Sequence, residues 1–162
     1  MLYPAEFGDD PLFPSAEDFE VLHKDELNGS GVITRRSWAK GQVIARMAGY
    51  PVSEILQHTL QIAPDLHNHD PFFSGYFLHS CEPNISLDME NMTVTALKSI
   101  KANSWLYMDY SETEDYLFKT FPCSCGTRSC RGWVTGRLQP APLMIDSGAE
   151  RSHFFEVAGD AC

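Results

Sequence analysis

The 162-residue sequence has no run of about 18 apolar residues, so it predicts no membrane-spanning helix. It is also poor in basic residues, since 12 lysines and arginines face 22 aspartates and glutamates and give a net charge of -10. This balance disfavours a nucleic-acid binder and fits a small, basic or neutral partner, although acidity that serves only solubility is the alternative that we favour. Residues 1–10 lack the basic region of a secretory signal, and no nuclear-localisation run is present. We therefore expect a cytoplasmic protein, with the nucleus as the alternative.

Cysteine is scarce and unevenly spread. Three of the five cysteines lie within eight residues, as Cys123, Cys125 and Cys130, in the pattern Cys-x-Cys-x4-Cys. In a chain with no expected export signal this favours metal binding over disulfides, and a redox cluster is the alternative. Thiolates at this density suit tetrahedral zinc, and three of them leave one position for a water or a distant residue. Cys81 is the natural candidate for that residue, and Cys162 is expected to be a free thiol.

Long helical patterns are also missing from the sequence. Short apolar or alternating segments, separated by turn residues such as Asn28-Gly29, predict strands instead. We expect strands at 19–23, 31–35, 42–47, 59–62, 85–88, 92–97 and 105–110. Brief helices are expected at 52–58, 72–77 and 112–121, and a loop at 63–71. The pattern predicts a small, mainly β domain with little helix.

Three polar motifs could carry chemistry, and each has a structural alternative. Gly29-Ser30-Gly31 is either a plain hairpin turn or a place where backbone approaches a ligand. Tyr110 ends an apolar strand, so its hydroxyl is either tied to a packing partner or able to orient an amine. Residues 67–70, His-Asn-His-Asp, form a solvated loop or a metal site, and His67 or His69 could contact a substrate.

A fourth segment, Leu78-His79-Ser80-Cys81-Glu82-Pro83-Asn84, gains meaning from the segments around it. Together they resemble the SET-domain family of S-adenosylmethionine-dependent methyltransferases. The stretch 78–84 is similar to the family signature Asn-His-Ser-Cys-x-Pro-Asn, and 105–110 is similar to its Asp-Tyr strand. Gly29-Ser30-Gly31-Val32-Ile33 looks like the first SET motif, and 121–133 resembles the zinc-binding post-SET segment. The similarity runs from about residue 19 to residue 136.

The resemblance implies a mainly β, small SET-type fold of short curved sheets, with a knot-like C-terminal threading. It places a SET domain at 19–119 and a post-SET zinc-binding segment at 120–136, and composition predicts an extended N-terminal arm at 1–18 and a loose tail at 137–162. Phe7, Leu12 and Phe13 are expected to pin the arm. The cofactor is expected on one face, with a narrow channel for the substrate amine on the other.

The resemblance also implies the roles of individual residues. Tyr110 corresponds to the catalytic tyrosine, whose hydroxyl lies near the transferring methyl group. The implied cofactors are S-adenosylmethionine and zinc. The implied cofactor-binding residues are Gly29, Ser30, Gly31, Leu78, His79, Tyr110, Phe121 and Trp133. The implied zinc ligands are Cys81, Cys123, Cys125 and Cys130.

Several positions depart from the family pattern. Leu78 stands where the signature has asparagine, Gly75 where an arginine is frequent, and Met108 where an aromatic residue governs the number of methyl groups added. Asn103-Ser104-Trp105 replaces Gly-Glu-Glu, and Arg46-Met47 replaces Glu-Tyr. Leu78 cannot hydrogen-bond the cofactor through its side chain, although its backbone can.

Three functions follow from these observations. The first is a methyltransferase acting on a lysine of a protein or peptide. The second is a SET-fold enzyme acting on a small molecule, and the third is a non-catalytic SET module that binds a partner. Retention of His79, Asp109, Tyr110 and the cysteine set favours an enzyme, whereas Leu78 favours the second and third functions. No direct nucleic-acid or membrane partner is expected.

Overall fold

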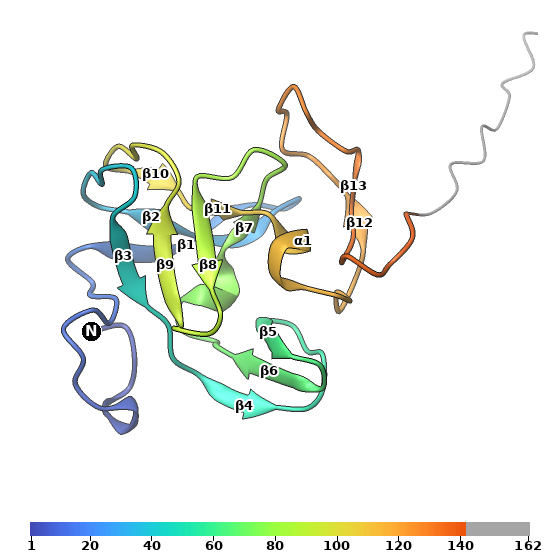
Figure 1. Ribbon diagram of the computed structural model, residues 1–162. Helices are drawn as coiled ribbons and strands as arrows, with labels where there is room; N and C mark the ends of the chain where they lie inside the picture. The colour runs from blue at the N-terminus through green and yellow to red at the C-terminus, as the bar shows by residue number, and fades with distance from the viewer. Residues whose placement is uncertain (142–162) are drawn as a thin grey trace, which may run out of the picture.

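The strands form five small sheets instead of one continuous sheet (Figure 1). The structure is a computed structural model and describes residues 1–141. Three sheets have three strands and two have two strands. Within the described residues a single turn of α-helix is present, and no helix is long and apolar enough to cross a membrane. The predicted mainly β fold with little helix is confirmed.

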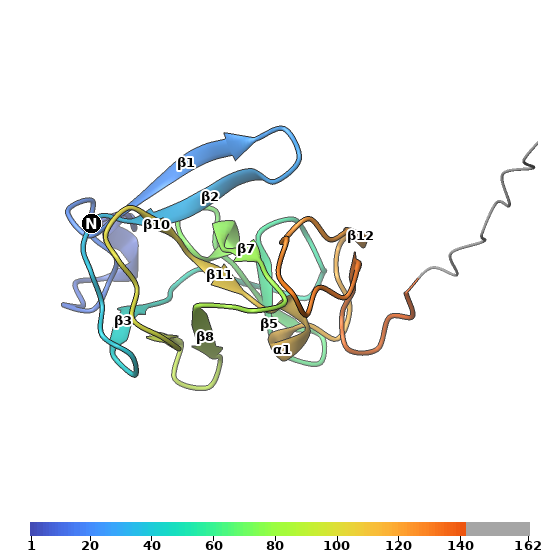
Figure 2. The same ribbon diagram turned by 90° about the horizontal axis from the view of Figure 1, so that it is seen from above.

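The first sheet contains the longest hairpin and has the order β1-β2-β10. Its strands are β1 (Phe19–Asp25), β2 (Gly29–Thr34) and β10 (Ser104–Trp105). Asp25 closes the β1–β2 turn by accepting hydrogen bonds from the backbone N–H groups of Leu27 and Asn28. Gly29 follows with a φ of 68°, which a residue without Cβ adopts at little cost. The hairpin predicted from Asn28-Gly29 is therefore confirmed, and Figure 2 shows it along one edge of the molecule.

The second sheet contains a hairpin whose turn is also closed by an aspartate. Its order is β3-β9-β8, formed by β3 (Val43–Arg46), β9 (Thr93–Ala96) and β8 (Ile85–Asp88). Asp88 accepts hydrogen bonds from the N–H groups of Glu90 and Asn91, as Asp25 does in the first hairpin. Ile85 and Val94 point into the core and are fully buried. The three strands predicted in these regions are confirmed.

The third sheet corrects two predictions. It has the order β4-β6-β5, with β4 (Tyr50–Val52), β6 (Leu66–His69) and β5 (Thr59–Ala63). The helix predicted at 52–58 is wrong, because Tyr50–Val52 is an edge strand and no helix follows it. The loop predicted at 63–71 is also wrong, because β6 is the central strand. Strand β5 is confirmed.

The polar residues of β6 are buried instead of solvated. Pairing with β4 on one side and β5 on the other satisfies the backbone of β6, so the pairing overrides its weak β propensity. His67 and Asn68 are buried, and Asp70 just after the strand is fully buried. The interpretation of 67–70 as a solvated loop is therefore wrong.

The last elements join segments that are far apart in the sequence. The parallel strands β7 (Leu78–His79) and β11 (Tyr107–Met108) lie next to α1 (Tyr110–Thr113). The predicted strand at 105–110 is broken after Trp105 and ends at Met108, and the helix predicted at 112–121 is wrong beyond Thr113. The post-SET-like segment adds β12 (Phe121–Pro122) and β13 (Trp133–Val134). The 3₁₀ helices are η1 (Ala5–Phe7) and η2 (Ser74–Tyr76), and η2 falls within the helix predicted at 72–77.

The N-terminal arm is anchored by a residue that the sequence analysis did not name. Tyr3 is buried, and its ring makes edge contacts with Phe7 and Phe13. Its hydroxyl donates to Asp70 Oδ2 at 2.6 Å. Leu12, by contrast, is exposed. The arm is therefore tied to the core through Asp70, which also accepts from three backbone N–H groups of the segment that leads into η2.

The Tyr3–Asp70 hydrogen bond generates a stability prediction. The Tyr3→Phe variant removes the donor to a buried carboxylate, so we expect a loss of about 1–3 kcal/mol in the free energy of unfolding, measured with urea. Tyr50→Phe is the matched control, because the Tyr50 hydroxyl donates to the exposed Glu6. We expect a change below about 0.5 kcal/mol for the control. Equal effects of the two variants would contradict this role of Tyr3.

Candidate functional site

One cavity of about 920 Å³ gathers most of the residues that the motifs singled out. Its walls come from the β1–β2 turn, the loop between β4 and β5, the segment 74–79, and the chain from Tyr110 to Ser124. Six of the predicted cofactor-binding residues line it: Gly29, Ser30, Leu78, His79, Tyr110 and Phe121. Gly31 and Trp133 do not line this cavity. Trp133 lies in a smaller pocket of about 290 Å³ with Ser111 and Arg131.

The cavity exists because β7 and β11 bring the signature segment and the Asp-Tyr segment together. Ser80 N–H donates to the Met108 carbonyl at 2.9 Å. At the other end, Asn84 Nδ2 donates to the Trp105 carbonyl at 2.8 Å, and Asn84 Oδ1 accepts from Tyr107 N–H at 2.8 Å. The amide of Asn84 thus replaces a missing strand partner. This double attachment holds His79 and Tyr110 at one wall of the cavity.

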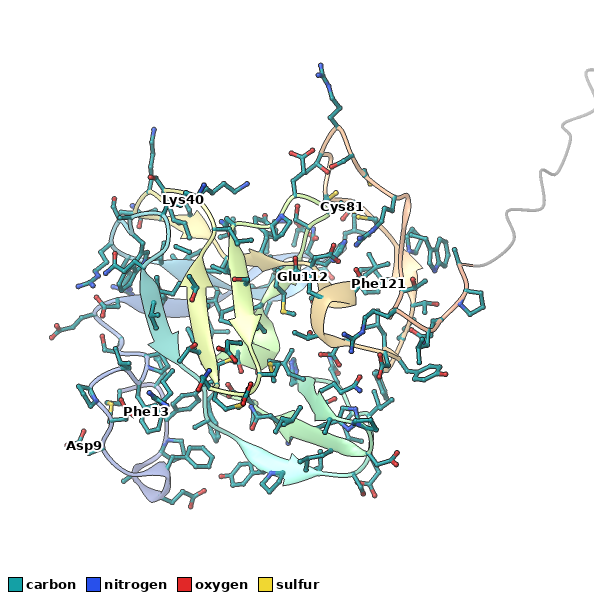
Figure 3. All side chains as sticks on the ribbon, viewed as in Figure 1. Asp9, Phe13, Lys40, Cys81, Glu112 and Phe121 are labelled. Carbon is teal, nitrogen blue, oxygen red and sulfur yellow. The ribbon has the colours of Figure 1, made fainter. Side chains whose placement is uncertain are left out.

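The four predicted zinc ligands meet beside this wall. The sulfur atoms of Cys81, Cys123, Cys125 and Cys130 all lie within 4.8 Å of one another. The Cys81 and Cys123 sulfurs are 3.8 Å apart. Zinc–sulfur bonds of about 2.3 Å in a tetrahedron place sulfurs about 3.8 Å apart, so the spacing fits zinc. Figure 3 shows Cys81 next to the segment that carries the other three cysteines.

Backbone groups around the cysteines also suit bound thiolates. Arg131 N–H lies 3.4 Å from Cys81 Sγ, and Gly132 N–H lies 3.4 Å from Cys130 Sγ. Such N–H···S contacts stabilise the negative charge of thiolates that bind a metal. The residues present therefore fit a structural zinc site with four sulfur ligands and no open position.

His79 connects the cysteines to the cavity wall. It is buried, and desolvation together with the Arg131 charge lowers the pKa of His79 to about 4, although Asp109 opposes this. Its Nδ1 accepts from Tyr110 N–H at 3.4 Å, which leaves the proton of the neutral ring on Nε2. That nitrogen lies 3.5 Å from Cys81 Sγ. His79 thus positions the backbone of Tyr110.

Asp109 holds the post-SET-like segment against α1. Burial opposes ionisation of its carboxyl, but Arg131 and Ser111 hold the pKa of Asp109 below its ordinary value. Arg131 donates to both carboxylate oxygens, at 2.6 and 2.7 Å. Asp109 also caps α1 by accepting from Ser111 N–H at 3.1 Å. The sequence analysis named Asp109 but missed Arg131, whose place beside Cys130 was the available signal.

Tyr110 begins α1 instead of ending a strand. Its hydroxyl donates to the Phe77 carbonyl at 2.8 Å, and the ring makes an edge contact with Phe121 at 6.3 Å between centroids. Burial, and then the negative charge of Glu114, raise the pKa of Tyr110 above its ordinary value. The phenol is therefore fixed in direction and stays protonated at neutral pH. Its oxygen lone pairs can accept a hydrogen bond from an amine in the cavity.

Packing explains two departures from the family pattern, Leu78 and Gly75. A Cβ at Gly31 would lie 2.7 Å from Leu78 Cδ1, so Gly31 makes room for the Leu78 side chain instead of for a ligand. A Cβ at Gly75 would lie 2.3 Å from the Asp70 carbonyl oxygen. His58 fills the space beside Gly75, and its Nδ1 lies 2.8 Å from the Gly75 carbonyl oxygen. An arginine at position 75 is therefore excluded by packing.

Several lining residues were not predicted from the sequence. Glu114 and His58 line the cavity, as do Phe118 and Lys119 from the segment after α1. No motif marks them, because their approach to Tyr110 depends on how this segment and the β4–β5 loop fold over the cavity. His67 and His69 are not among the lining residues.

Comparison with known proteins supports the resemblance. No family model matches the chain. The histone-lysine N-methyltransferase ash1 of Drosophila melanogaster is 27% identical over 157 residues, which cover 81% of this chain and 7% of ash1. This chain thus spans a small part of that relative.

Solved structures give the same fold. KRYPTONITE in complex with mCHG DNA and SAH superposes with a TM-score of 0.58 at 21% identity, over 71% of this chain and 28% of that chain. The methyltransferase domain of human histone-lysine N-methyltransferase SETMAR superposes with a TM-score of 0.55 at 20% identity, over 73% of this chain and 58% of that chain. The chain therefore has the SET fold, and its resemblance to the SET-domain methyltransferase family is confirmed.

Proposed function

We propose that this chain is an S-adenosylmethionine-dependent methyltransferase of the SET type that methylates a lysine amine of a protein or peptide. The observation that carries the proposal is the fixed Tyr110 hydroxyl on the cavity wall, 2.8 Å from the Phe77 carbonyl. The phenol hydrogen is tied to a packing partner, and the oxygen keeps lone pairs that can orient an amine, so this arrangement serves a catalytic tyrosine.

The cofactor assignment rests on the chain's own residues and on its relatives. Six predicted cofactor-binding residues line the cavity, and its volume of about 920 Å³ lies within the range of small-molecule sites. The KRYPTONITE structures contain SAH, and ash1 is a histone-lysine N-methyltransferase. When bound, S-adenosylmethionine supplies a sulfonium methyl group. The backbone of Leu78 and the residues Gly29 and Ser30 would hold it.

The proposed mechanism relies on positioning. The acceptor amine donates a hydrogen bond to the Tyr110 oxygen, because the phenol hydrogen is already committed to the Phe77 carbonyl. Phe121 limits the freedom of the Tyr110 ring, and the cysteine cluster fixes the segment that carries Phe121. Orientation of the amine lone pair toward the methyl group makes the reaction effectively unimolecular, which lowers the entropic part of its barrier.

The rim of the cavity favours a peptide as the substrate. Leu27, Leu56 and Phe118 line the cavity, yet they are 73%, 41% and 62% exposed. Exposed apolar side chains at a cavity mouth are typical of surfaces that bind another chain. A KRYPTONITE structure contains an H3(1–15) peptide, and the net charge of -10 fits a basic peptide.

We propose no direct nucleic-acid partner for this chain. The KRYPTONITE structures contain DNA, but this chain covers 28% of the KRYPTONITE chain in complex with mCHG DNA. An acidic protein also gains little from phosphate contacts. The cytoplasm stays our predicted compartment, with the nucleus as the alternative.

A non-catalytic binding module is the second candidate. Leu78 favours it, because its side chain lies where the family signature has an amide and packs on Gly31. Calorimetric titration of the zinc-loaded protein with S-adenosylmethionine and, separately, with S-adenosylhomocysteine distinguishes the two. We expect both to bind with dissociation constants between about 1 μM and 1 mM. No binding of either would reject the enzyme and leave the binding module.

The Tyr110→Phe variant tests the catalytic assignment. We expect the rate of methyl transfer to lysine-containing peptides to fall by about 100-fold or more, because the hydrogen bond that orients the amine is lost. Binding of S-adenosylhomocysteine is expected to persist. Tyr116→Phe is the matched control, because Tyr116 is exposed and does not line the cavity. Unchanged turnover in Tyr110→Phe would reject the assignment of Tyr110 as the catalytic residue.

Removal of metal tests the cysteine cluster. We expect one zinc ion per chain, and its removal by a chelator should release the segment 121–134 and weaken S-adenosylhomocysteine binding. The readouts are the metal content, the reactivity of the thiols and calorimetry. Restored binding after zinc is added back serves as the control. An unchanged affinity for S-adenosylhomocysteine after chelation would reject the proposed dependence of the cavity on zinc.

A further inference from the structure

We infer that Glu114 is the group that binds the acceptor amine in its ammonium form, so that the cavity selects cationic amines over neutral acceptors. This inference rests on the proposed function, because it names the substrate class of the same site. It concerns a residue that no motif of the sequence marks.

Glu114 differs from the other acidic residues in its location, because it is buried and lines the cavity. The chain has 22 aspartates and glutamates, yet Glu114 is the one acidic residue among the described residues that line the cavity. It is 4% exposed, whereas acidic side chains are mostly found on the surface. A carboxylate at the inner wall of a cavity is therefore a specific feature of this site.

The hydrogen bonds of Glu114 come from neutral groups. Gln61 N–H donates to both carboxylate oxygens, at 3.0 and 3.2 Å, and Thr113 Oγ1 donates to Oε1 at 2.8 Å. No lysine, arginine or histidine within residues 1–141 forms an ion pair with it. Oε2 keeps lone pairs that these bonds do not use. A buried carboxylate without a cation is costly, and a ligand that carries a positive charge offsets that cost.

The position of Glu114 is fixed by its neighbours. The Gln61 side chain donates to Asp115 Oδ2 at 2.7 Å and accepts from Asp115 N–H at 2.7 Å. Four hydrogen bonds, two at Glu114 and two at Asp115, therefore join β5 to the two residues that follow α1. Arg137 donates to Asp115 and to the Thr113 carbonyl. The carboxylate is therefore held in place before any ligand arrives.

Glu114 also lies close to Tyr110. Its backbone N–H donates to the Tyr110 carbonyl at 2.9 Å, and its negative charge contributes to the raised pKa of the Tyr110 phenol. Both residues line the same cavity, so an ammonium group bound there is within reach of the negative field of Glu114. Burial raises the pKa of Glu114, which brings it closer to the pKa of an amine and eases transfer of one N–H proton to the carboxylate.

Other charged groups near Glu114 do not take over this role. Asp115 is paired with Arg137, so their charges largely offset each other next to the carboxylate. His79 also lines the cavity, but its Nδ1 already accepts from Tyr110 N–H. Lys119 is exposed, and as a cation it cannot bind an ammonium ion. Glu114 is thus the group in this wall whose charge suits a cation.

The test is a titration of the full chain with n-butylammonium chloride, a minimal probe of a lysine side chain, in the absence of cofactor. Binding is followed by amide NMR, with the Gln61 N–H signal as a local reporter because it donates to Glu114. We expect saturable binding to the wild type and about tenfold or more weaker binding to Glu114→Gln, which removes the charge and keeps an acceptor for Gln61. 1-Butanol, a neutral probe of similar size, is expected to bind at least about tenfold more weakly than the ammonium ion to the wild type.

The control is Glu112→Gln, an identical charge change two residues away. Glu112, labelled in Figure 3, is exposed on α1 and does not line the cavity. We expect its affinity for n-butylammonium to stay within about twofold of the wild type. Equal weakening by both variants, or equal affinity of the wild type for n-butylammonium and 1-butanol, would overturn the inference.

The probe comparison on the wild type decides the question even where Glu114→Gln does not fold. The experiment also separates this inference from the proposed function, because it needs neither methyl transfer nor cofactor. Selective binding of the ammonium ion without cofactor binding would support Glu114 and reject the enzyme. Cofactor binding without ammonium selectivity would support the enzyme and reject the role of Glu114.

Discussion

The parallel pairing of β7 with β11 is the constraint on which the site depends. It joins segments separated by about thirty residues and is closed at its far end by the amide of Asn84, which bonds the backbone of Trp105 and Tyr107. Because His79 and Cys81 lie on one side of this junction and Tyr110 on the other, the cavity wall and the metal-binding cluster arise from the same few hydrogen bonds. A change of register at this junction would separate the tyrosine from the cysteine that anchors the neighbouring segment.

The hairpins and the cysteine cluster could be predicted because their causes are local or compositional. Two Asp-x-x-Asn turns specify the β1–β2 and β8–β9 hairpins through bonds from Asp25 and Asp88 to nearby N–H groups. The cysteine spacing required only that Cys81 come close, and it does. In both cases a few neighbouring residues contain the whole signal.

The missed features depend on partners that are distant in the sequence. Strand β6 is polar, and it became a strand because β4 and β5 pair with it on both sides. The role of Gly31 could not be read from the sequence, since the residue that needs its small size, Leu78, is far along the chain. Glu114 is buried where Gln61 of the distant strand β5, together with the adjacent Thr113, supplies its hydrogen bonds. The roles of such residues can be identified only from tertiary contacts, because no sequence motif marks them.

The ligand spacing of the cysteine cluster sets an order of events during folding. Cys81 and Cys123 are 42 positions apart, so a single ion that bridges them closes a long loop whose entropy is costly in the unfolded chain. The three later cysteines are close enough in sequence to capture a metal locally, whereas in the structure the fourth ligand, Cys81, follows directly from the β7–β11 pairing. Complete coordination therefore follows assembly of the core. The number of sulfur ligands on the metal, and not the metal content alone, would therefore report on whether β7 and β11 had paired.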